Sequence, residues 1–378
     1  MELIHLEGYK RYWVVRPGSG SPFLSHFEQN NCIAIGHIDE VPFSTDGTIT
    51  GEDIDTAVSH INQAQQQKEA EERDTVAQIS KKVGAARTFV CELSIGDVIL
   101  SPKDDAILIG TVTSEPFISS TPLRATKANG EINRKELTYK LRRKVQWDGV
   151  KVKSFLPWQL KDSLRTSQTI FSLDQHKTLL EHWLYSIFIN ESGLHFSTRI
   201  SQTTAIKQFQ VTEFQRLIQK LELIADLIVA DEVNTENTSD FLEFIDSMYY
   251  RYGLAQKFTL TTSQSFASPG NIWSYVPLLN TENKKKLLVL ALLVQSSFAH
   301  ATPDDLPSSG LLTQAEISQI NNASSIIRTA GHFDEFRSGL NASLDERRKT
   351  TVNVEPQSVP VEQRVVFPEV SSEGDTGR

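Results

Sequence analysis

The sequence has little cysteine, which limits the chemistry it can support. Its two cysteines, Cys32 and Cys91, both stand among apolar, strand-forming residues. A disulfide framework needs paired cysteines in a secreted protein, and a zinc site needs closely spaced cysteines or histidines. The cysteines therefore indicate small core residues of a reduced, cytosolic protein.

Long apolar runs are also absent. The longest, Leu287–Val294, has eight residues, whereas a helix needs about 20 to cross a bilayer. The first residues, Met1–His5, lack the basic and apolar regions of a signal peptide. We therefore expect no membrane association and a cytoplasmic location.

Several motifs that carry catalysis or nucleotide binding are missing. The chain contains no G-x-x-x-x-G-K-[ST] loop, no G-x-G-x-x-G turn and no G-x-S-x-G nucleophile elbow. His176 and His182 are six residues apart, a spacing that places them on different faces of a helix and disfavours a shared metal. We expect no catalytic residue, no metal ligand and no cofactor.

The charge is acidic overall but uneven along the chain. The formal net charge is −9, yet residues 121–153 hold ten Lys or Arg against three Asp or Glu. The densest part is Lys140–Lys144. A solvated face is the usual meaning of such a run, and a phosphate-binding strip on an acidic protein is the alternative.

Two short apolar segments organise the first half. Tyr12–Val15 and Cys32–Ile35 are rich in aromatic and β-branched residues and each is followed by a loop, which is typical of buried strands. Gly36 stands where the backbone passes close to another group. Arg16 and His37 follow the two strands, so their side chains are candidates for the mouth of one pocket. The alternative is a pair of core strands with nothing bound.

The rest of the first half predicts a small mixed β-barrel with one helical insertion. A helical pattern runs over 52–83, with an exposed turn expected within it. Segments 98–102 and 106–113 flank a short polar loop, which predicts a β-hairpin. Residues 144–147 form a further strand-like run that ends at an Asp-Gly turn.

The second half is predicted to be all-helical. Helices are expected over residues 174–189, 211–228, 239–252, 281–300 and 313–329. The helix at 211–228 carries the most continuous apolar stripe, and Thr313–Glu316 has a capping-box pattern. From about residue 350 the chain is rich in Pro, Ser, Val and Glu, which favours a disordered, partner-binding tail.

Five motifs in order give the first half a specific resemblance. They are Y-W-V-V-R-P-G-x-G from Tyr12, I-A-I-G-H from Ile33, I-G-D-V-I-L-x-P from Ile95, I-L-I-G-T-V from Ile107 and R-K-V-x-W from Arg143. This series resembles the EVE-like branch of the PUA-like superfamily, most closely the versions fused to prokaryotic restriction and defence proteins.

The resemblance implies a reader that holds a modified base of DNA or RNA in a pocket with aromatic walls. In this mechanism the base would be flipped into the barrel. The expected pocket residues are Trp13, Arg16, Ser19, Gly36, His37, Ser101, Phe117 and Trp147. In the same mechanism the basic run would hold the phosphates, through Lys140, Arg142, Arg143 and Lys144. Relatives commonly carry Trp after the Ile-Gly pair, where this chain has His37.

The expected fold class is α+β, a PUA-like (EVE-like) small mixed β-barrel followed by an all-α domain. The predicted domains are residues 1–172, the nucleic-acid reader, and residues 173–345, an α-helical interaction domain. Residues 346–378 are predicted to form a disordered tail. The expected function is non-catalytic recognition of modified nucleic acid, with modified DNA favoured, as the sensor of a defence or restriction system. A separate effector protein would bind the helical domain or the tail. Two alternatives remain: an enzyme with a nuclease or effector site in the helical half, and a scaffold whose barrel has lost its ligand.

Overall fold

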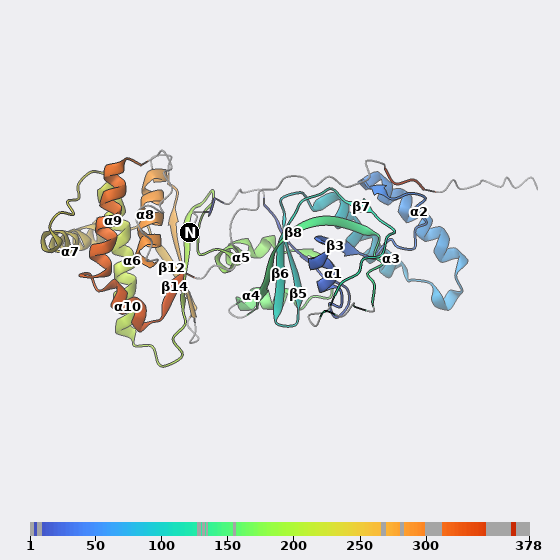
Figure 1. Ribbon diagram of the computed structural model, residues 1–378, viewed down its shortest axis with the longest axis horizontal. Helices are drawn as coiled ribbons and strands as arrows, with labels where there is room; N and C mark the ends of the chain where they lie inside the picture. The colour runs from blue at the N-terminus through green and yellow to red at the C-terminus, as the bar shows by residue number, and fades with distance from the viewer. Residues whose placement is uncertain are drawn as a thin grey trace, which may run out of the picture. The chain divides into compact units, whose positions relative to one another are not determined.

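A computed structural model gives the structure of the protein. It describes residues 4–5, 10–126, 130, 133, 135–153, 156–265, 270–279, 283–298, 312–344 and 364–367. The chain divides into two compact units (Figure 1). The N-terminal domain comprises the described residues of 10–177 together with 364–367. The C-terminal domain comprises residues 4–5 and the described residues of 178–344. The division therefore falls after Lys177, and each domain includes a short segment from the far end of the chain.

The N-terminal domain is built on an eight-stranded sheet that curls into a half-barrel. Seven strands follow the order β4-β7-β8-β6-β5-β2-β9, and β3 pairs with β8. The strands are β2 (Tyr12–Val15), β3 (Cys32–Ile35), β4 (Gly47–Thr48), β5 (Val98–Lys103), β6 (Ala106–Val112), β7 (Phe117–Ile118), β8 (Leu141–Val152) and β9 (Ile170–Ser172).

Burial explains why β2 and β3 are unbroken apolar runs. All four residues of each strand are buried, so both faces of each strand are covered. The predicted hairpin is confirmed: β5 and β6 pair antiparallel, and Asp104 in their tight turn has a left-handed φ of 44°. The strand predicted at 144–147 belongs to the longer β8, which pairs with β6 as well as with β3.

The helices of this domain are α1 (Leu24–Gln29), α2 (Gly51–Gln67), α3 (Val76–Arg87) and α4 (Trp158–Ser163). Capping boxes start α2, at Thr50 and Asp53, and α3, at Thr75 and Gln78. The helical insertion predicted over 52–83 is thus two helices, because the polar stretch between them has almost nothing to bury. At the C-terminal end of α3 the chain makes a π-helical turn over Thr88–Glu92.

The expectation of an all-α second half is wrong. The C-terminal domain contains a six-stranded sheet of order β1-β10-β11-β13-β12, with β14 also paired to β11. The strands are β1 (Ile4–His5), β10 (Ile187–Ile189), β11 (Gly193–Ile200), β12 (Thr261–Ser265), β13 (Gly270–Pro277) and β14 (Ala342–Leu344). Burial alternates residue by residue along β13, the pattern of a strand with two unlike faces.

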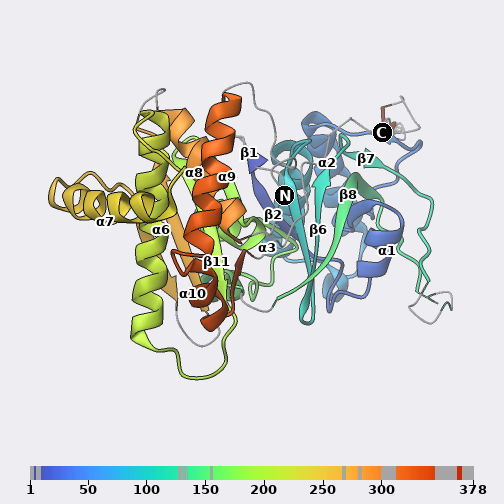
Figure 2. The ribbon, with the colours of Figure 1, turned by 60° about the vertical axis from the view of Figure 1, so that its left-hand side comes forward.

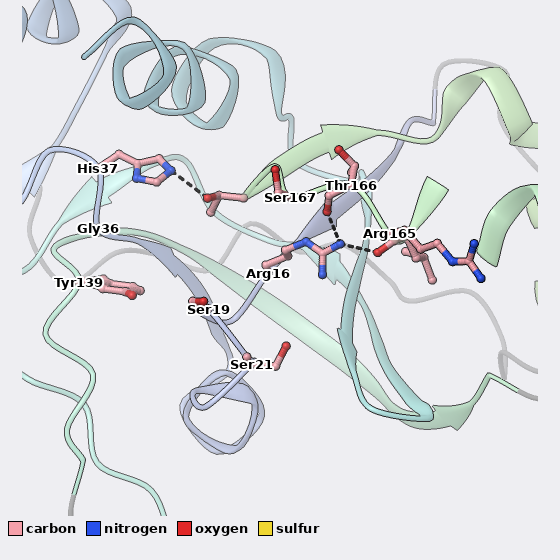
Figure 3. A pocket seen from close by; sticks show the side chains of 13 residues that line it. Arg16, Ser19, Ser21, Gly36, His37, Tyr139, Arg165, Thr166 and Ser167 are labelled. Carbon is pink, nitrogen blue, oxygen red and sulfur yellow. Dashed lines mark hydrogen bonds between the residues drawn. The ribbon is translucent and has the colours of Figure 1, made fainter. Parts of the chain in front are cut away.

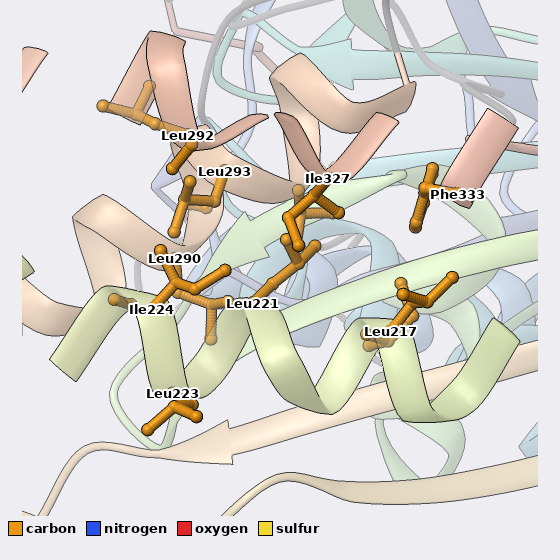
Figure 4. Close-up of a cluster of buried hydrophobic side chains, with 14 of the residues drawn as sticks. Leu217, Leu221, Leu223, Ile224, Leu290, Leu292, Leu293, Ile327 and Phe333 are labelled. Atoms are coloured by element: carbon orange, nitrogen blue, oxygen red, sulfur yellow. The ribbon is translucent and has the colours of Figure 1, made fainter. Parts of the chain in front are cut away.

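The helices of this domain are α5 (Lys177–Leu184), α6 (Gln208–Val229), α7 (Thr238–Leu254), α8 (Asn283–Phe298), α9 (Gln314–Arg328) and α10 (Phe333–Gly339). Helices α6, α8, α9 and α10 lie on one face of the sheet, and α7 packs against α6 (Figure 2). Helix α5 lies on the other face, where His182 stacks on Trp273 of β13. The predicted helix at 211–228 is confirmed as α6, and the capping box of α9 joins Thr313 and Glu316 as expected. Leu221 and Ile224 of α6, Leu290 of α8 and Ile327 of α9 meet in one apolar cluster (Figure 4).

Candidate functional site

A cavity of about 560 Å³ lies in the N-terminal domain where several strand ends meet (Figure 3). Four segments line it: the turn that follows β2, the two residues that follow β3, the residue Tyr139 ahead of β8, and the loop before β9. Its volume is in the range of small-molecule sites. The lining residues are Arg16, Gly18, Ser19, Gly20, Ser21, Gly36, His37, Tyr139, Leu164, Arg165, Thr166, Ser167 and Thr169.

Arg16 fixes one wall of the cavity. Its Nε donates to the carbonyl of Gln168 at 3.1 Å, and Nη2 donates to the carbonyls of Leu164 and Thr166 at 2.5 and 2.6 Å. Burial lowers the pKa of Arg16, but arginine keeps its charge at neutral pH. Among the described residues Nη1 has no hydrogen-bond partner. Arg16 therefore holds the 164–168 loop in place and keeps one cationic donor for a ligand.

His37 contributes a neutral imidazole. Its Nε2 lies 3.0 Å from the hydroxyl oxygen of Thr169. Burial, and then the charges of Lys82 and Lys81, lower the pKa of His37 below its ordinary value of 6.5. The uncharged ring has one N–H donor and one acceptor, and the tautomer decides which of them faces Thr169. His37 thus presents a polar edge that can pair with a neutral heterocycle.

Gly36 lets an aromatic ring form the opposite wall. A Cβ at Gly36 would lie 2.5 Å from the Tyr139 ring and 2.8 Å from a carboxylate oxygen of Asp39. The Tyr139 ring also meets Phe23 edge-on, with centroids 5.3 Å apart. Burial and the charge of Asp39 raise the pKa of Tyr139, so its hydroxyl stays protonated. The expectation that backbone passes close to another group at Gly36 is confirmed, and the group is this ring.

The turn after β2 adds backbone donors. Gly18 and Gly20 both have left-handed φ, at 80° and 70°, and the turn between them is closed by the Ser21 N–H donating to the Gly18 carbonyl at 3.0 Å. In the described residues, the N–H groups of Ser19 and Gly20 have no acceptor. Unpaired amides at a left-handed turn form a concavity that suits an oxygen-rich or anionic group.

The structure brings together four of the eight predicted pocket residues: Arg16, Ser19, Gly36 and His37. The other four have different roles. Trp13 is 1% exposed in the domain core, and its indole N–H donates to Asp97 at 2.9 Å. Ser101 is buried and donates to the carbonyl of Val15 at 2.8 Å.

Phe117 and Trp147, expected as stacking partners, lie outside this cavity. Phe117 lines a separate cavity of about 330 Å³ together with Arg142 and Lys144. The indole N–H of Trp147 donates to the carbonyl of Phe27 at 2.8 Å. The aromatic wall is instead Tyr139, which no local sequence pattern predicted. The antiparallel register of β3 and β8 pairs Ile35 with Leu141, so the residues that follow β3 meet those that precede β8.

The predicted phosphate-binding strip needs a correction. Arg142 and Arg143 are 3% and 1% exposed. The guanidinium of Arg142 donates to the carbonyls of Tyr139 and Thr121 at 2.7 Å each, whereas that of Arg143 donates to three carbonyls at 2.9–3.1 Å. Both arginines are therefore structural, because both faces of this part of β8 are covered.

The two lysines of the strip differ. The ammonium of Lys140 donates to the carbonyls of Asp39 and Val41 at 2.9 and 3.3 Å, and so ties the chain after β3 to the start of β8. Lys144 is half-buried, with its ammonium 6.0 Å from the centre of the Phe117 ring. Arg165 lines the cavity and is a largely exposed cation, with its side chain 82% exposed. Lys81 on α3 is also exposed, and its charge acts on His37.

The described residues contain no group of three or more His, Cys, Asp or Glu side chains placed to hold a metal ion. Both cysteines are free, and burial raises the pKa of Cys32 to about 11. Among the described helices none is long and apolar enough to span a bilayer. Comparison of the chain with protein-family models, with curated proteins and with solved structures gives no match.

Proposed function

We propose that the N-terminal domain reads a modified base of nucleic acid, with DNA favoured, by holding the flipped base in the cavity between Arg16, His37 and Tyr139. The observation that carries the proposal is the convergence of these three side chains on one cavity at the strand ends. The resemblance of the sequence to EVE-like domains of the PUA-like superfamily supports it. In this proposal the protein binds and does not cleave its ligand.

The chemistry of each wall suits a nucleobase. Stacking on an aromatic ring contributes about 1–3 kcal/mol per base, and Tyr139 supplies such a ring. The neutral His37 and the free Nη1 of Arg16 supply donors and an acceptor for the polar edge of the base. The base flips out of the duplex at a cost of a few kcal/mol, which the pocket contacts offset for the base that fits.

The phosphates would meet a different set of cations from that predicted by the sequence. Arg165 lines the cavity, and its only ion pair in the described residues is an exposed one with Asp162 at 3.5 Å. Lys81 is exposed and close enough to His37 to lower the pKa of that histidine. Exposed ion pairs contribute little, so Arg165 can exchange Asp162 for a phosphate at small cost.

We place this reader in the cytoplasm as the sensor of a prokaryotic defence or restriction system, following the branch of the family that the sequence resembles. A separate effector protein would then bind the C-terminal domain or the tail.

The test is a binding comparison on the full chain. Duplexes carrying 5-methylcytosine, 5-hydroxymethylcytosine or N6-methyladenine at one position are titrated against an unmodified duplex of the same sequence. We expect Tyr139→Ala to lower the preference for the favoured modification by about tenfold, the equivalent of about 1.4 kcal/mol of stacking. Tyr139→Phe keeps the ring and is expected to keep the preference.

The dependence of binding affinity on salt concentration distinguishes phosphate contacts from base recognition. Arg165→Ala and Lys81→Ala are expected to weaken binding to modified and plain duplex equally and to reduce the salt slope by up to about one per contact. Equal losses on both duplexes for Tyr139→Ala as well would refute a reading pocket. The domain would then bind nucleic acid without recognising a particular base.

A further inference from the structure

The outer edge of strand β4 is covered by a segment from the far end of the chain. β4 is the terminal strand of its sheet and pairs with β7 on one side. On its other side lie residues 364–367. The Ser44 N–H donates to the carbonyl of Val366 at 2.7 Å, and the Val365 N–H donates to the carbonyl of Thr48 at 3.1 Å. Main-chain hydrogen bonds thus join the segment to a strand edge that would otherwise be open.

The side chains of the segment alternate between the domain and solvent. Val365 is 6% exposed and belongs to the apolar core of the N-terminal domain. The ring of Phe367 stacks on His60 with centroids 5.4 Å apart and an interplanar angle of 8°, and it also contacts Phe43 at 5.5 Å. Val366, between them, is 50% exposed. The contacting surface, which is called the β4 edge site below and includes Phe43, Ser44, Thr48 and His60, therefore distinguishes Val365 and Phe367 from Val366.

Arg364 adds a charged contact at the start of α2. Its Nη2 donates to the Thr50 hydroxyl at 3.0 Å and to an Asp53 carboxylate oxygen at 3.3 Å, and lies 4.0 Å from Glu52. Asp53 is the same residue that closes the capping box of α2. A cation at this position complements the carboxylates of the first helical turn, and it fixes the direction in which the segment lies.

We propose that residues 364–367 are a peptide ligand carried by the chain itself, and that the β4 edge site is a peptide-recognition site that reads Arg, Val and Phe of an R-V-x-F sequence. The mode is strand addition, in which main-chain bonds give affinity and pockets for alternate side chains give specificity. The site is separate from the nucleic-acid cavity, and none of its contacting residues lines that cavity. The proposal does not depend on the proposed function.

Residues 364–367 are covalently attached to the domain that they contact, and this attachment lowers the affinity that so short a segment needs. A peptide joined to its receptor through a chain segment has an effective concentration on the order of mM. A peptide with only modest affinity therefore occupies the β4 edge site of its own chain. A partner that displays the same sequence binds only when the tethered segment is displaced.

The experiment releases residues 364–367 from the β4 edge site without shortening the chain. The full-length double variant Arg364→Glu with Phe367→Ala is titrated with a fluorescent peptide of residues 361–370, and anisotropy is recorded. We expect this variant to bind the peptide at least about tenfold more tightly than the wild-type chain, because the tethered segment competes in the wild type. A peptide with V366A is expected to bind as the parent peptide does, and peptides with R364E or F367A at least tenfold more weakly.

The receptor side has a matched pair on one helix. Both substitutions are made in the double variant. His60→Ala removes the ring on which Phe367 stacks, whereas Asn62→Ala changes an exposed residue two positions further along α2. His60→Ala is expected to weaken peptide binding and Asn62→Ala to leave it unchanged. Equal binding of the parent and F367A peptides would overturn the proposal.

A second measurement detects docking of residues 364–367 without relying on peptide binding. Hydrogen exchange of the Ser44 amide reports its bond to Val366 directly. We expect this amide to exchange at least about tenfold faster in the double variant than in the wild type. Unchanged exchange in a chain that keeps its melting temperature would show that the segment is not docked in solution, and would also overturn the proposal.

Discussion

The guanidinium of Arg143 ties strand β8 to the π-helical turn that follows α3. Arg143 is almost fully buried, and its guanidinium donates to the carbonyls of Phe89, Val90 and Ser114. Two of these carbonyls belong to the π-helical turn, where the regular helical bonds are disrupted. Burial lowers the pKa of Arg143 to about 10, which still leaves it charged at pH 7.

Gly36 leaves room for the Tyr139 ring, and a methyl group at this position would remove that room. Gly36→Ala places a Cβ against the Tyr139 ring, so the ring must move or the strand end must shift. We expect a loss of about 1–3 kcal/mol in the free energy of unfolding, as for other overpacked sites, together with weaker ligand binding in the cavity. Urea unfolding measures the first effect.

Gly84 is the matched control for this substitution. It lies within α3, and a Cβ there meets nothing within 4 Å. Gly84→Ala should raise the free energy of unfolding by about 0.5–1 kcal/mol because the unfolded chain loses conformational freedom. If Gly36→Ala behaved like Gly84→Ala, the close packing of Tyr139 on Gly36 would be wrong.

At the scale of elements, α6 and α8 are joined by a buried charge cluster as well as by apolar packing. Glu222 is fully buried and accepts hydrogen bonds from the Thr259 N–H, the Thr259 hydroxyl and the Leu260 N–H at 2.7–3.1 Å. The ammonium of Lys286 on α8 reaches Glu222 at 3.2 Å and Asp226 at 2.9 Å. The carboxylate thus anchors both a helix and the chain that leads to β12.

Removing this carboxylate leaves a buried ammonium with one partner fewer and two amides without an acceptor. We expect Glu222→Ala to cost about 3–5 kcal/mol of unfolding free energy, the range for a broken buried pair. Glu213→Ala, on the same helix, removes a partly exposed pair with Arg216 and should cost about 1 kcal/mol or less. Chemical denaturation of both variants gives the comparison, and equal costs would contradict a structural role for Glu222.

At the scale of the whole molecule, the C-terminal domain contains two buried histidines that make its stability depend on pH. His182 packs against His195 and Trp273, with ring centroids 5.3 and 5.8 Å apart, and His195 stacks on Phe188 at 4.7 Å. Burial lowers the pKa of His182 to about 3, helped by the charge of His195, and lowers the pKa of His195 to about 4. Both rings are therefore neutral in the folded domain.

The sign of the pH effect follows from these shifts. Between the folded pKa values and the ordinary value of 6.5 the unfolded chain binds more protons than the folded domain, so acid favours unfolding. The stabilisation is complete above about pH 6.5 and is lost as the pH falls toward 4 and then 3. From pH 7 to 4.5 we expect a loss on the order of 2 kcal/mol per histidine.

Hydrogen exchange of peptides from β11 follows the C-terminal domain alone during this acid titration. His195→Gln should remove about half of the pH-dependent loss that His182 and His195 cause together. His176, which lies in the N-terminal domain, serves as the control, and His176→Gln should leave the profile of β11 unchanged. A wild-type profile that stays flat from pH 7 to 4.5 would contradict neutral buried histidines.

The sequence by itself determined the elements whose signals are local. The stripe of α6, the capping box of α9 and the hairpin β5–β6 follow from periodicity and turn chemistry within a few residues. The mouth formed by Arg16 and His37 was also predictable, because each residue directly follows a recognisable buried strand. Strands β10 and β11 were missed since short apolar runs suit a helix end and a strand equally well.

Only the tertiary structure decided which distant segments meet. The pairing of β3 with β8 brought Tyr139 to the cavity and buried Arg142 and Arg143. The pairing of β1 with β10 placed residues 4–5 in the C-terminal domain, and the open edge of β4 took up residues 364–367. Sheet pairing joins residues far apart in the chain, and composition and periodicity describe only neighbours in sequence. For that reason the sequence located the cavity, and the fold supplied its aromatic wall.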